Sequence, residues 1–190
     1  MLGEYERIAL ERFASDGFRT VTIEEIADRA GVSARTMYRY FPTKEDFLVA
    51  FPRRGTDATV EALAALAPAD DPLLAAWQLI REFFLTTPTD VELLNLWRQA
   101  AEQAPEVVAR IRGERTQALH DAVAAYCARS LGTSPQADLR AHLLGGIIAG
   151  LEFAVVEAWG RSERPLTEIL DAAEQSIREI DAAGGRPPGR

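Results

Sequence analysis

Residues 22–47 of the 190-residue chain read "TIEEIADRAGVSARTMYRYFPTKEDF" and contain the local signals that decide the fold of this region. Thr22 is a good helix N-cap, and Glu25 three residues later completes a capping box, so a helix is predicted to begin directly after the cap. Gly31 supplies the left-handed residue that ends this helix, and Ser33 can cap a second short one. Two short helices joined by a tight turn with glycine form a helix-turn-helix.

The second short helix is predicted to turn basic side chains outward. Met37 and Phe41 are four residues apart and face the interior, which leaves Arg35 and Arg39 together on one outward strip. Guanine presents two acceptors in the major groove of DNA, and an arginine on a rigid helix can meet both. The arrangement therefore favours a helix that reads bases.

Neighbouring side chains are suited to the DNA backbone. Thr22, Tyr38 and Tyr40 carry hydroxyls that can contact phosphates, which fix the register of a protein on DNA rather than its sequence preference. Lys44 is predicted to stand at the first turn of a helix capped by Thr43, where its charge opposes the helix dipole unless a phosphate binds there. For any single residue, a solvated face with half-buried tyrosines explains the pattern as well.

Acidic and basic residues are distributed unevenly. The net charge is −8, but residues 1–54 contain nine of the 21 basic and nine of the 29 acidic residues, so the whole excess lies further on. A strongly acidic protein is a poor general binder of polyanions. Contact with nucleic acid is therefore expected only at a small patch, for which residues 33–54, with five basic and two acidic side chains, are the candidate.

Composition favours a soluble globular protein, with 47% hydrophobic and 26% charged residues. The single Cys127 excludes an internal disulfide and the two histidines lie far apart, so we expect no metal site, no cofactor and a reducing cytoplasm. Residues 1–10 lack the pattern of a signal peptide, and the apolar segment Leu143–Leu151 is much shorter than a membrane span. An enzyme would be indicated by a paired nucleophile and base or by a glycine-rich phosphate loop. The sequence contains neither feature.

Apolar residues recur with the period of an α-helix almost throughout, so the predicted fold class is all-α, with about nine helices separated by glycine and proline. The predicted helices are Gly3–Ser15, Ile23–Ala30, Ala34–Tyr40, Lys44–Leu66, Leu73–Leu85, Val91–Gln103, Glu106–Leu131, Gln136–Gly160 and Leu166–Ala182.

Residues 13–47, "FASDGFRTVTIEEIADRAGVSARTMYRYFPTKEDF", resemble the DNA-binding signature of the TetR family of bacterial transcriptional regulators. The resemblance implies an N-terminal three-helix DNA-binding domain, a larger helical domain for ligand binding and dimerisation, and a homodimer that usually acts as a repressor on double-stranded DNA with an inverted repeat. By position it implies base-reading roles for Arg35, Thr36 and Arg39, and phosphate contacts for Thr22, Tyr38, Tyr40 and Lys44.

We therefore expect a helix-turn-helix domain in residues 1–50, a ligand-binding and dimerisation domain in 51–183 and a disordered tail in 184–190. Residues 96–115 and 147–159 are similar to the C-terminal domains of TetR regulators that respond to acyl-CoA-like or other apolar ligands, which implies an unidentified, apolar effector. Aromatic residues are spaced to share one interior, either a plain core or a ligand cavity. They are Trp77, Phe83, Phe84, Trp97 and Tyr126. Polar residues that could anchor a ligand are Arg81, Arg98, Gln99, Gln103 and His120, but no ligand-binding residue is assigned.

Two features depart from the family pattern. Many members carry a basic arm before the first helix, whereas residues 1–6 include two acids, so contact with the minor groove is not expected. The fourth helix is usually unbroken, but Pro52 and Gly55 in "FPRRG" predict a kink or break that acts as a hinge. Arg53 and Arg54 are then expected to face solvent or DNA.

The helix predicted over Gln136–Gly160 is apolar nearly all round, so it must be covered on several sides. Either it is the central helix of a monomer, or it pairs with the last helix in a symmetric four-helix interface between two copies. The predicted interface residues are Gly145, Gly146, Gly150, Leu166, Ile169 and Leu170.

The leading hypothesis is a ligand-responsive, dimeric repressor. A ligand-independent regulator or an activator of the same fold remains open, as does a helical carrier or enzyme with a vestigial helix-turn-helix.

Overall fold

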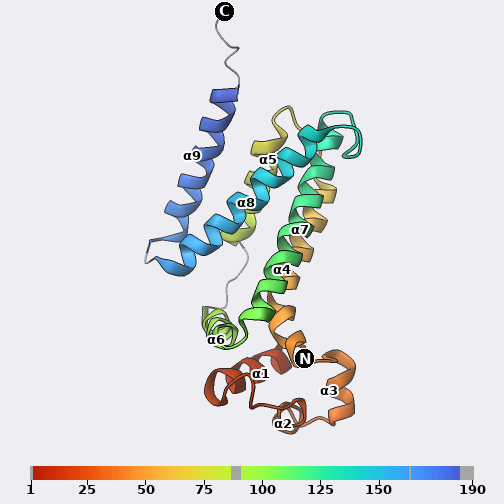
Figure 1. The fold of residues 1–190 in the computed structure, drawn as a ribbon, viewed down its shortest axis with the longest axis vertical. Coiled ribbons are helices and arrows are strands. Elements are labelled where there is room, and N and C mark those ends of the chain that lie inside the picture. The colour runs from red at the N-terminus through yellow and green to blue at the C-terminus, as the bar shows by residue number, and fades with distance from the viewer. Residues whose placement is uncertain (1, 87–90, 163, 185–190) are drawn as a thin grey trace, which may run out of the picture. The chain divides into compact units, whose positions relative to one another are not determined.

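A computed structural model describes residues 2–86, 91–162 and 164–184, and every regular element in those ranges is an α-helix (Figure 1). The predicted all-α class is confirmed. The helices are α1 (Leu2–Asp16), α2 (Ile23–Arg29), α3 (Ala34–Tyr40), α4 (Glu45–Ala65), α5 (Pro72–Thr86), α6 (Val91–Glu102), α7 (Pro105–Ser130), α8 (Leu139–Arg161) and α9 (Leu166–Gly184).

The chain forms two compact units that do not coincide with the predicted domains. The first unit comprises residues 1–57 and 88–115, and the second comprises 58–87 and 116–190. Helices α4 and α7 each continue from one unit into the other. Helix α6 and the start of α7 therefore pack with the helix-turn-helix, whereas the sequence predicted a second domain over residues 51–183.

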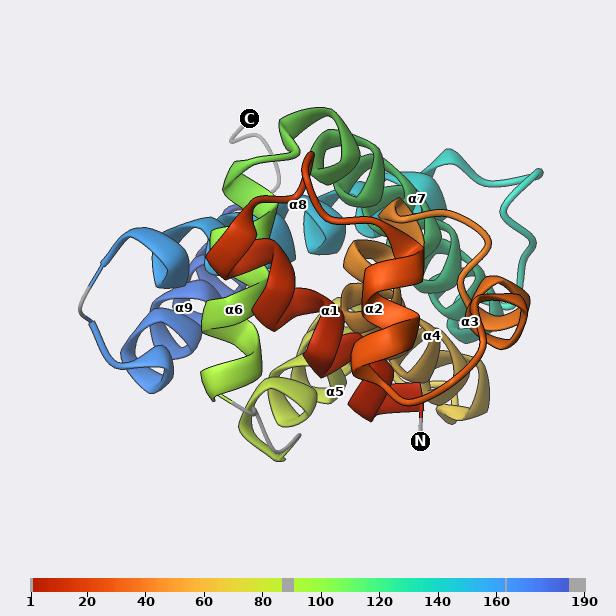
Figure 2. The same cartoon turned by 90° about the horizontal axis from the view of Figure 1, so that it is seen from below.

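The core of the first unit forms where α1 lies along α6 and α2 packs on α3 (Figure 2). Phe13, Ile26 and Met37 are fully buried in it, and the rings of Phe41 and Phe47 stack with centroids 4.0 Å apart. Burial of each large apolar side chain contributes about 1.5 to 3 kcal/mol relative to exposure. The inward direction predicted for Met37 and Phe41 is thereby confirmed.

Helix α4 is continuous through Pro52, so the predicted break does not occur, and a kink at this position stays a prediction. The two arginines after the proline are also not free. Arg54 Nη1 lies 2.6 Å from Oε2 of the fully buried Glu6 on α1, and Arg53 Nη2 lies 3.8 Å from Glu114 Oε2 on α7. Burial raises the pKa of Glu6, and the hydrogen bond from Arg54 opposes that rise. These contacts connect α4 to α1 and α7 within the first unit.

The core of the second unit is built around the fully buried side chains of Trp77 and Tyr126. Trp97 does not join them, because it packs in the core of the first unit with its ring 6.4 Å from that of Phe51. Four of the five aromatic residues that were expected to share one interior are thus divided between two cores, with Trp77, Phe84 and Tyr126 in the second unit and Trp97 in the first.

Helix α8 begins at Leu139, three residues later than predicted, because the Asp138 side chain accepts a hydrogen bond from the Arg140 N–H and caps the helix. By length and composition alone α8 could cross a bilayer, but buried core helices of soluble proteins meet the same test. The predicted tail begins at Gly184, which ends α9, and its remainder, residues 185–190, lies outside the described residues.

Candidate nucleic-acid interface

The helix-turn-helix is set by local capping. The Thr22 hydroxyl accepts a hydrogen bond from the Glu25 N–H, and the Glu25 carboxylate accepts one from the Thr22 N–H, which lowers the pKa of Glu25. Gly31 has a φ of 69°, and the Ser33 hydroxyl accepts from the Thr36 N–H to start α3. The predicted capping box, left-handed glycine and second cap are all confirmed.

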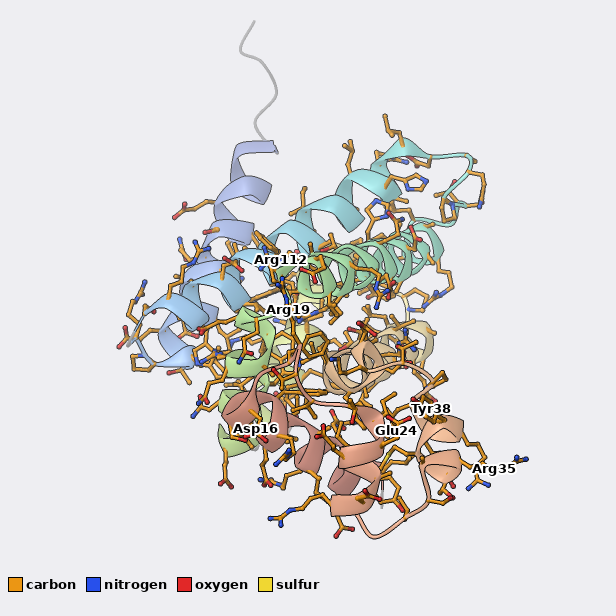
Figure 3. The ribbon with its side chains drawn as sticks, turned by 60° about the horizontal axis from the view of Figure 1, so that its bottom comes forward. Asp16, Arg19, Glu24, Arg35, Tyr38 and Arg112 are labelled. Carbon is orange, nitrogen blue, oxygen red and sulfur yellow. The ribbon has the colours of Figure 1, made fainter. Side chains whose placement is uncertain are left out.

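Helix α3 presents Arg35 to solvent. The side chain is exposed and points away from the protein (Figure 3), and no described residue forms an ion pair or hydrogen bond with its guanidinium. A guanidinium with all its donors available on a rigid, capped helix has the geometry needed for two hydrogen bonds to one base edge.

The other two predicted base-reading residues already have partners in α3 or at its N-cap. Arg39 Nη2 donates to the Tyr40 hydroxyl at 2.9 Å, and its guanidinium lies over the Tyr40 ring. The hydroxyls of Thr36 and Ser33 are 2.9 Å apart. Because these side chains are solvent-accessible, DNA can replace such contacts at small cost.

Tyr38 is held by an acidic neighbour. Its hydroxyl donates to Glu24 Oε1 on α2 at 2.9 Å, and this bond raises the pKa of Tyr38 (Figure 3). A phosphate contact by Tyr38 therefore requires the hydroxyl to exchange one anionic acceptor for another.

Lys44 differs most from its prediction. Helix α4 begins after it, at Glu45, and its Nζ donates to the backbone carbonyls of Arg19 at 3.1 Å and Val21 at 3.0 Å. The ammonium also lies 4.9 Å from the centre of the Phe18 ring. Lys44 thus stabilises the loop between α1 and α2 through these two hydrogen bonds. At most one of its three N–H donors remains for a phosphate.

Three of the six residues predicted for a dimer interface are buried within the single chain. A Cβ atom on Gly145 would lie 2.6 Å from the His120 carbonyl oxygen, so this glycine permits the approach of α8 to α7. Ile169 and Leu170 belong to the core of the second unit, and Leu166 packs partly against it. Only Gly146 and Gly150 are exposed with open space around them.

An exposed apolar stripe runs along α8 through these two glycines. Its members recur at alternating intervals of four and three residues, the spacing of a helix-pairing seam. The stripe, called the α8 seam below, consists of Leu139, Leu143, Gly146, Gly150 and Phe153. Leu139 is 71% and Leu143 58% exposed, so the stripe is open to solvent in the single chain.

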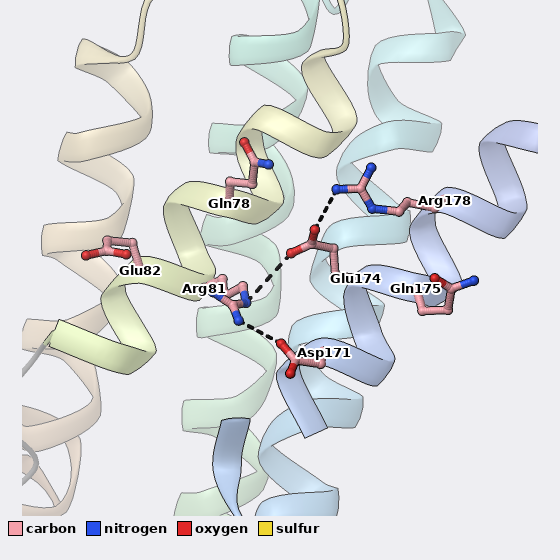
Figure 4. A pocket seen from close by; sticks show the side chains of 7 residues that line it. All are labelled: Gln78, Arg81, Glu82, Asp171, Glu174, Gln175 and Arg178. Atoms are coloured by element: carbon pink, nitrogen blue, oxygen red, sulfur yellow. Dashed lines mark hydrogen bonds and ion pairs between the residues drawn. The ribbon is translucent and has the colours of Figure 1, made fainter. Parts of the chain in front are cut away.

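A pocket of about 500 Å³ lies between α5 and α9 (Figure 4). Its charges pair internally, since Arg81 contacts Asp171 at 2.7 Å and Glu174 at 3.7 Å, and Arg178 contacts Glu174 at 2.7 Å. The remaining lining residues are Gln78, Glu82 and Gln175. Every residue that lines this pocket is polar or charged.

Comparison with known families fits this geometry. The sequence model described as "Bacterial regulatory proteins, tetR family" matches residues 7–51, and that described as "MftR C-terminal domain" matches residues 71–180. The chain belongs to the TetR family. The resemblance carried by residues 13–47 is confirmed.

Relatives of this TetR-family chain include the HTH-type transcriptional activator FasR of Mycolicibacterium smegmatis (strain ATCC 700084 / mc(2)155), 29% identical over 83% of this chain and 71% of FasR. The regulator MftR of Mycobacterium tuberculosis (strain ATCC 25618 / H37Rv) is 26% identical over 87% of this chain and 83% of its own. A solved structure, that of Mycobacterium smegmatis AmtR, covers 97% of this chain and 95% of its own at 20% identity, with a TM-score of 0.45. The family assignment supports a DNA-binding transcriptional regulator.

Sequence reasoning missed two residues of α6 and its C-terminal turn that form hydrogen bonds with α1, the loop after it and α4. The Gln103 side chain accepts from the Phe18 N–H at 2.9 Å and donates to the Phe13 carbonyl at 3.2 Å. Trp97 Nε1 donates to the Leu48 carbonyl at 2.8 Å. The sequence suggests Gln103 only as a possible ligand anchor, and no local signal marks a bond between residues so far apart in sequence.

Proposed function

We propose that this TetR-family protein is a sequence-specific transcriptional regulator that reads double-stranded DNA with the exposed face of α3. The observation that carries the proposal is the Arg35 guanidinium, which is exposed and without a described partner beside a well-capped helix start. Arg39 and Thr36 join it as base-reading residues when DNA replaces their present contacts. Thr22, Tyr38 and Tyr40 contact phosphates, with Lys44 in a lesser part.

The test begins by selecting bound duplexes from a random DNA library with the wild-type protein, which yields the selected duplex used below. Arg35→Ala should weaken binding to it by roughly 1 to 3 kcal/mol and relax the preference at one base position in each half-site. Arg164→Ala, which removes an exposed arginine on the second unit, serves as the matched control and should change neither quantity. Equal losses by Arg35→Ala on selected and scrambled duplexes would show that this arginine contacts phosphate only.

The regulator acts in the cytoplasm as a homodimer joined through the α8 seam. A stripe of exposed leucine and phenylalanine with open glycines at its centre allows two helices to approach closely. A two-fold protein reads a two-fold site, so the selected duplex should contain an inverted repeat.

The regulatory outcome is repression that a small, apolar effector relieves, as the family resemblance implies. The second candidate is activation, because the relative FasR is named an activator. A reporter gene whose promoter overlaps the selected sequence separates the two, since the protein should lower its transcription if it represses. Because the pocket between α5 and α9 is polar, an acyl-CoA series and a set of polar metabolites should both be screened for release of the selected duplex.

A further inference from the structure

Pro52 leaves one backbone acceptor of α4 without its usual donor. In a regular α-helix the N–H of residue 52 would donate to the carbonyl of residue 48, and proline has no N–H. Helix α4 nevertheless continues through Pro52, and Leu48 is fully buried. A buried carbonyl is seldom left unpaired in a folded protein, so another donor is expected at this point.

The donor comes from α6. Trp97 Nε1 donates to the Leu48 carbonyl oxygen at 2.8 Å, the acceptor that proline releases. The indole is partly buried in the core of the first unit beside the Phe51 ring. Helix α6 thus supplies the hydrogen bond that the backbone of α4 lacks.

A second directional contact fixes the other end of the same segment. The Gln103 amide forms hydrogen bonds on both sides of the turn after α1, since it accepts from the Phe18 N–H and donates to the Phe13 carbonyl. The space is tight, because a Cβ atom on Gly17 would lie 3.3 Å from Gln103 Oε1. Apolar packing alone tolerates sliding, whereas the hydrogen bonds of Trp97 and Gln103 fix the register of α6 on α4 and α1.

The position of Pro52 in α4 determines what the bond between Trp97 and the Leu48 carbonyl can influence. Pro52 lies five residues before Asp57, where the first unit ends, and α4 continues into the second unit. A helix that lacks an internal bond bends most easily at the missing bond. The bond from Trp97 that replaces it therefore controls the direction in which α4 leaves the first unit.

We propose that Trp97 is a positioning residue for DNA binding. Its indole N–H bonds to the Leu48 carbonyl, which Pro52 leaves without a backbone donor. This bond holds α4 in the direction that lets two copies of the chain contact both halves of an inverted repeat. The inference rests on the proposed function, because it concerns the geometry of the dimer on DNA. Trp97 itself contacts no base or phosphate in this account. Its effect should appear only when two DNA-binding units must be spaced correctly.

The first test detects the bond without DNA. The chain has three tryptophans, so a ¹⁵N-indole spectrum shows three N–H signals, and Trp97→Phe identifies the one from Trp97. We expect slow exchange of this N–H with solvent in the wild type and clearly faster exchange in Pro52→Ala, whose new backbone N–H competes for the same carbonyl. Exchange at the same rate in both proteins would overturn the link between Trp97 and Pro52.

The second test measures positioning on DNA. Trp97→Phe should weaken binding to the full selected duplex by about threefold to tenfold, the range expected for one hydrogen bond, and leave binding to a half-site duplex unchanged. In the Pro52→Ala background the same substitution should cost less than half as much. Trp77→Phe is the control, because the buried Trp77 Nε1 has no hydrogen-bond partner among the described residues, so the change removes an indole but no bond.

The outcomes separate the two claims. If the wild type selects no duplex but the indole of Trp97 responds to Pro52→Ala, the proposed function fails while the bond is real. The positioning role is wrong if the selected duplex is bound and Trp97→Phe weakens full-site and half-site duplexes alike. It is also wrong if Trp97→Phe costs the same factor in the wild-type and Pro52→Ala backgrounds.

Discussion

Lys44 illustrates at the scale of one residue how a side chain can have partners that its sequence pattern does not indicate. Its charge suggested a phosphate contact, but the ammonium donates to the carbonyls of Arg19 and Val21 across the turn that precedes α2. Neither partner is visible in a periodic pattern, because a lysine reaches backbone oxygens about two dozen residues away only after α1 and α4 have packed. Lys44 is therefore expected to stabilise the folded state.

We predict that Lys44→Met lowers the free energy of unfolding by about 1 to 3 kcal/mol, because it removes two charge-assisted hydrogen bonds and keeps the aliphatic stem. Chemical unfolding monitored by circular dichroism measures the loss. Arg35→Met is the matched control, since it removes a cationic group without a described partner and should leave stability unchanged. An unfolding curve of Lys44→Met that overlays the wild type would mean that the two carbonyls do not depend on this ammonium.

Cys127 offers a test of burial at the same scale. The side chain is fully buried, and burial, with a smaller effect of the Asp71 charge, raises the pKa of the thiol to about 11. Because the thiolate is the reactive form, only about one thiol in a thousand is ionised near pH 8. Alkylation by iodoacetamide should therefore be at least about a hundredfold slower in the folded protein than in guanidinium chloride. It should accelerate roughly tenfold for each unit of rising pH while the fold persists. Equal rates in the two conditions would place Cys127 at the surface.

At the scale of the element, capping chemistry made the helix-turn-helix predictable almost residue by residue. Thr22, Gly31 and Ser33 act through bonds and dihedral angles within four residues, so their sequence positions carry the information. Contacts between elements were not predictable. The bonds of Trp97 and Gln103 join residues 49 to 90 positions apart, and periodicity indicates only that a face is buried, not which atom meets it.

Gly145 shows the same limit, because the sequence predicted it in an interface between two copies and indicated no partner within the chain. The partner is the backbone of α7, since a Cβ atom would lie 2.6 Å from the His120 carbonyl oxygen. We predict that Gly145→Ala lowers stability by about 1 to 3 kcal/mol through overpacking against a backbone atom that cannot turn away. Gly113→Ala adds the same methyl group on α7 in open space and should raise stability by up to about 1 kcal/mol. Opposite signs in parallel unfolding experiments are expected, and equal effects would exclude the close contact.

At the scale of the whole molecule, α8 gives the chain two faces with different roles. The buried face contributes Ile148 and Val155 to the core of the second unit, and the exposed face forms the α8 seam. The sequence indicated that this helix is covered on several sides, but it could not separate the glycine that faces α7 from the two that face outward. To tell these glycines apart, one must know which side of α8 faces its neighbours. Only the packing of the helices determines this.

We predict a homodimer in solution that Gly146→Glu converts to a folded monomer, because a charged side chain at the centre of an apolar seam would be buried without a partner. Sedimentation measures the association state and circular dichroism confirms the fold. Ala65→Glu, which adds the same charge at an exposed position of α4, should remain dimeric. A wild-type monomer, or a dimeric and well-folded Gly146→Glu, would remove the α8 seam from the interface.

The central claim is that an acidic protein reads a DNA sequence through a small basic patch on α3. A salt titration of wild-type binding to the selected duplex and to a scrambled duplex of equal length tests it most directly. Both affinities should fall as salt rises, because phosphate contacts release counterions, while the selected duplex remains bound at least about a thousandfold more tightly at physiological salt. A ratio near one across the titration would contradict the account, since the patch would then recognise charge and not sequence.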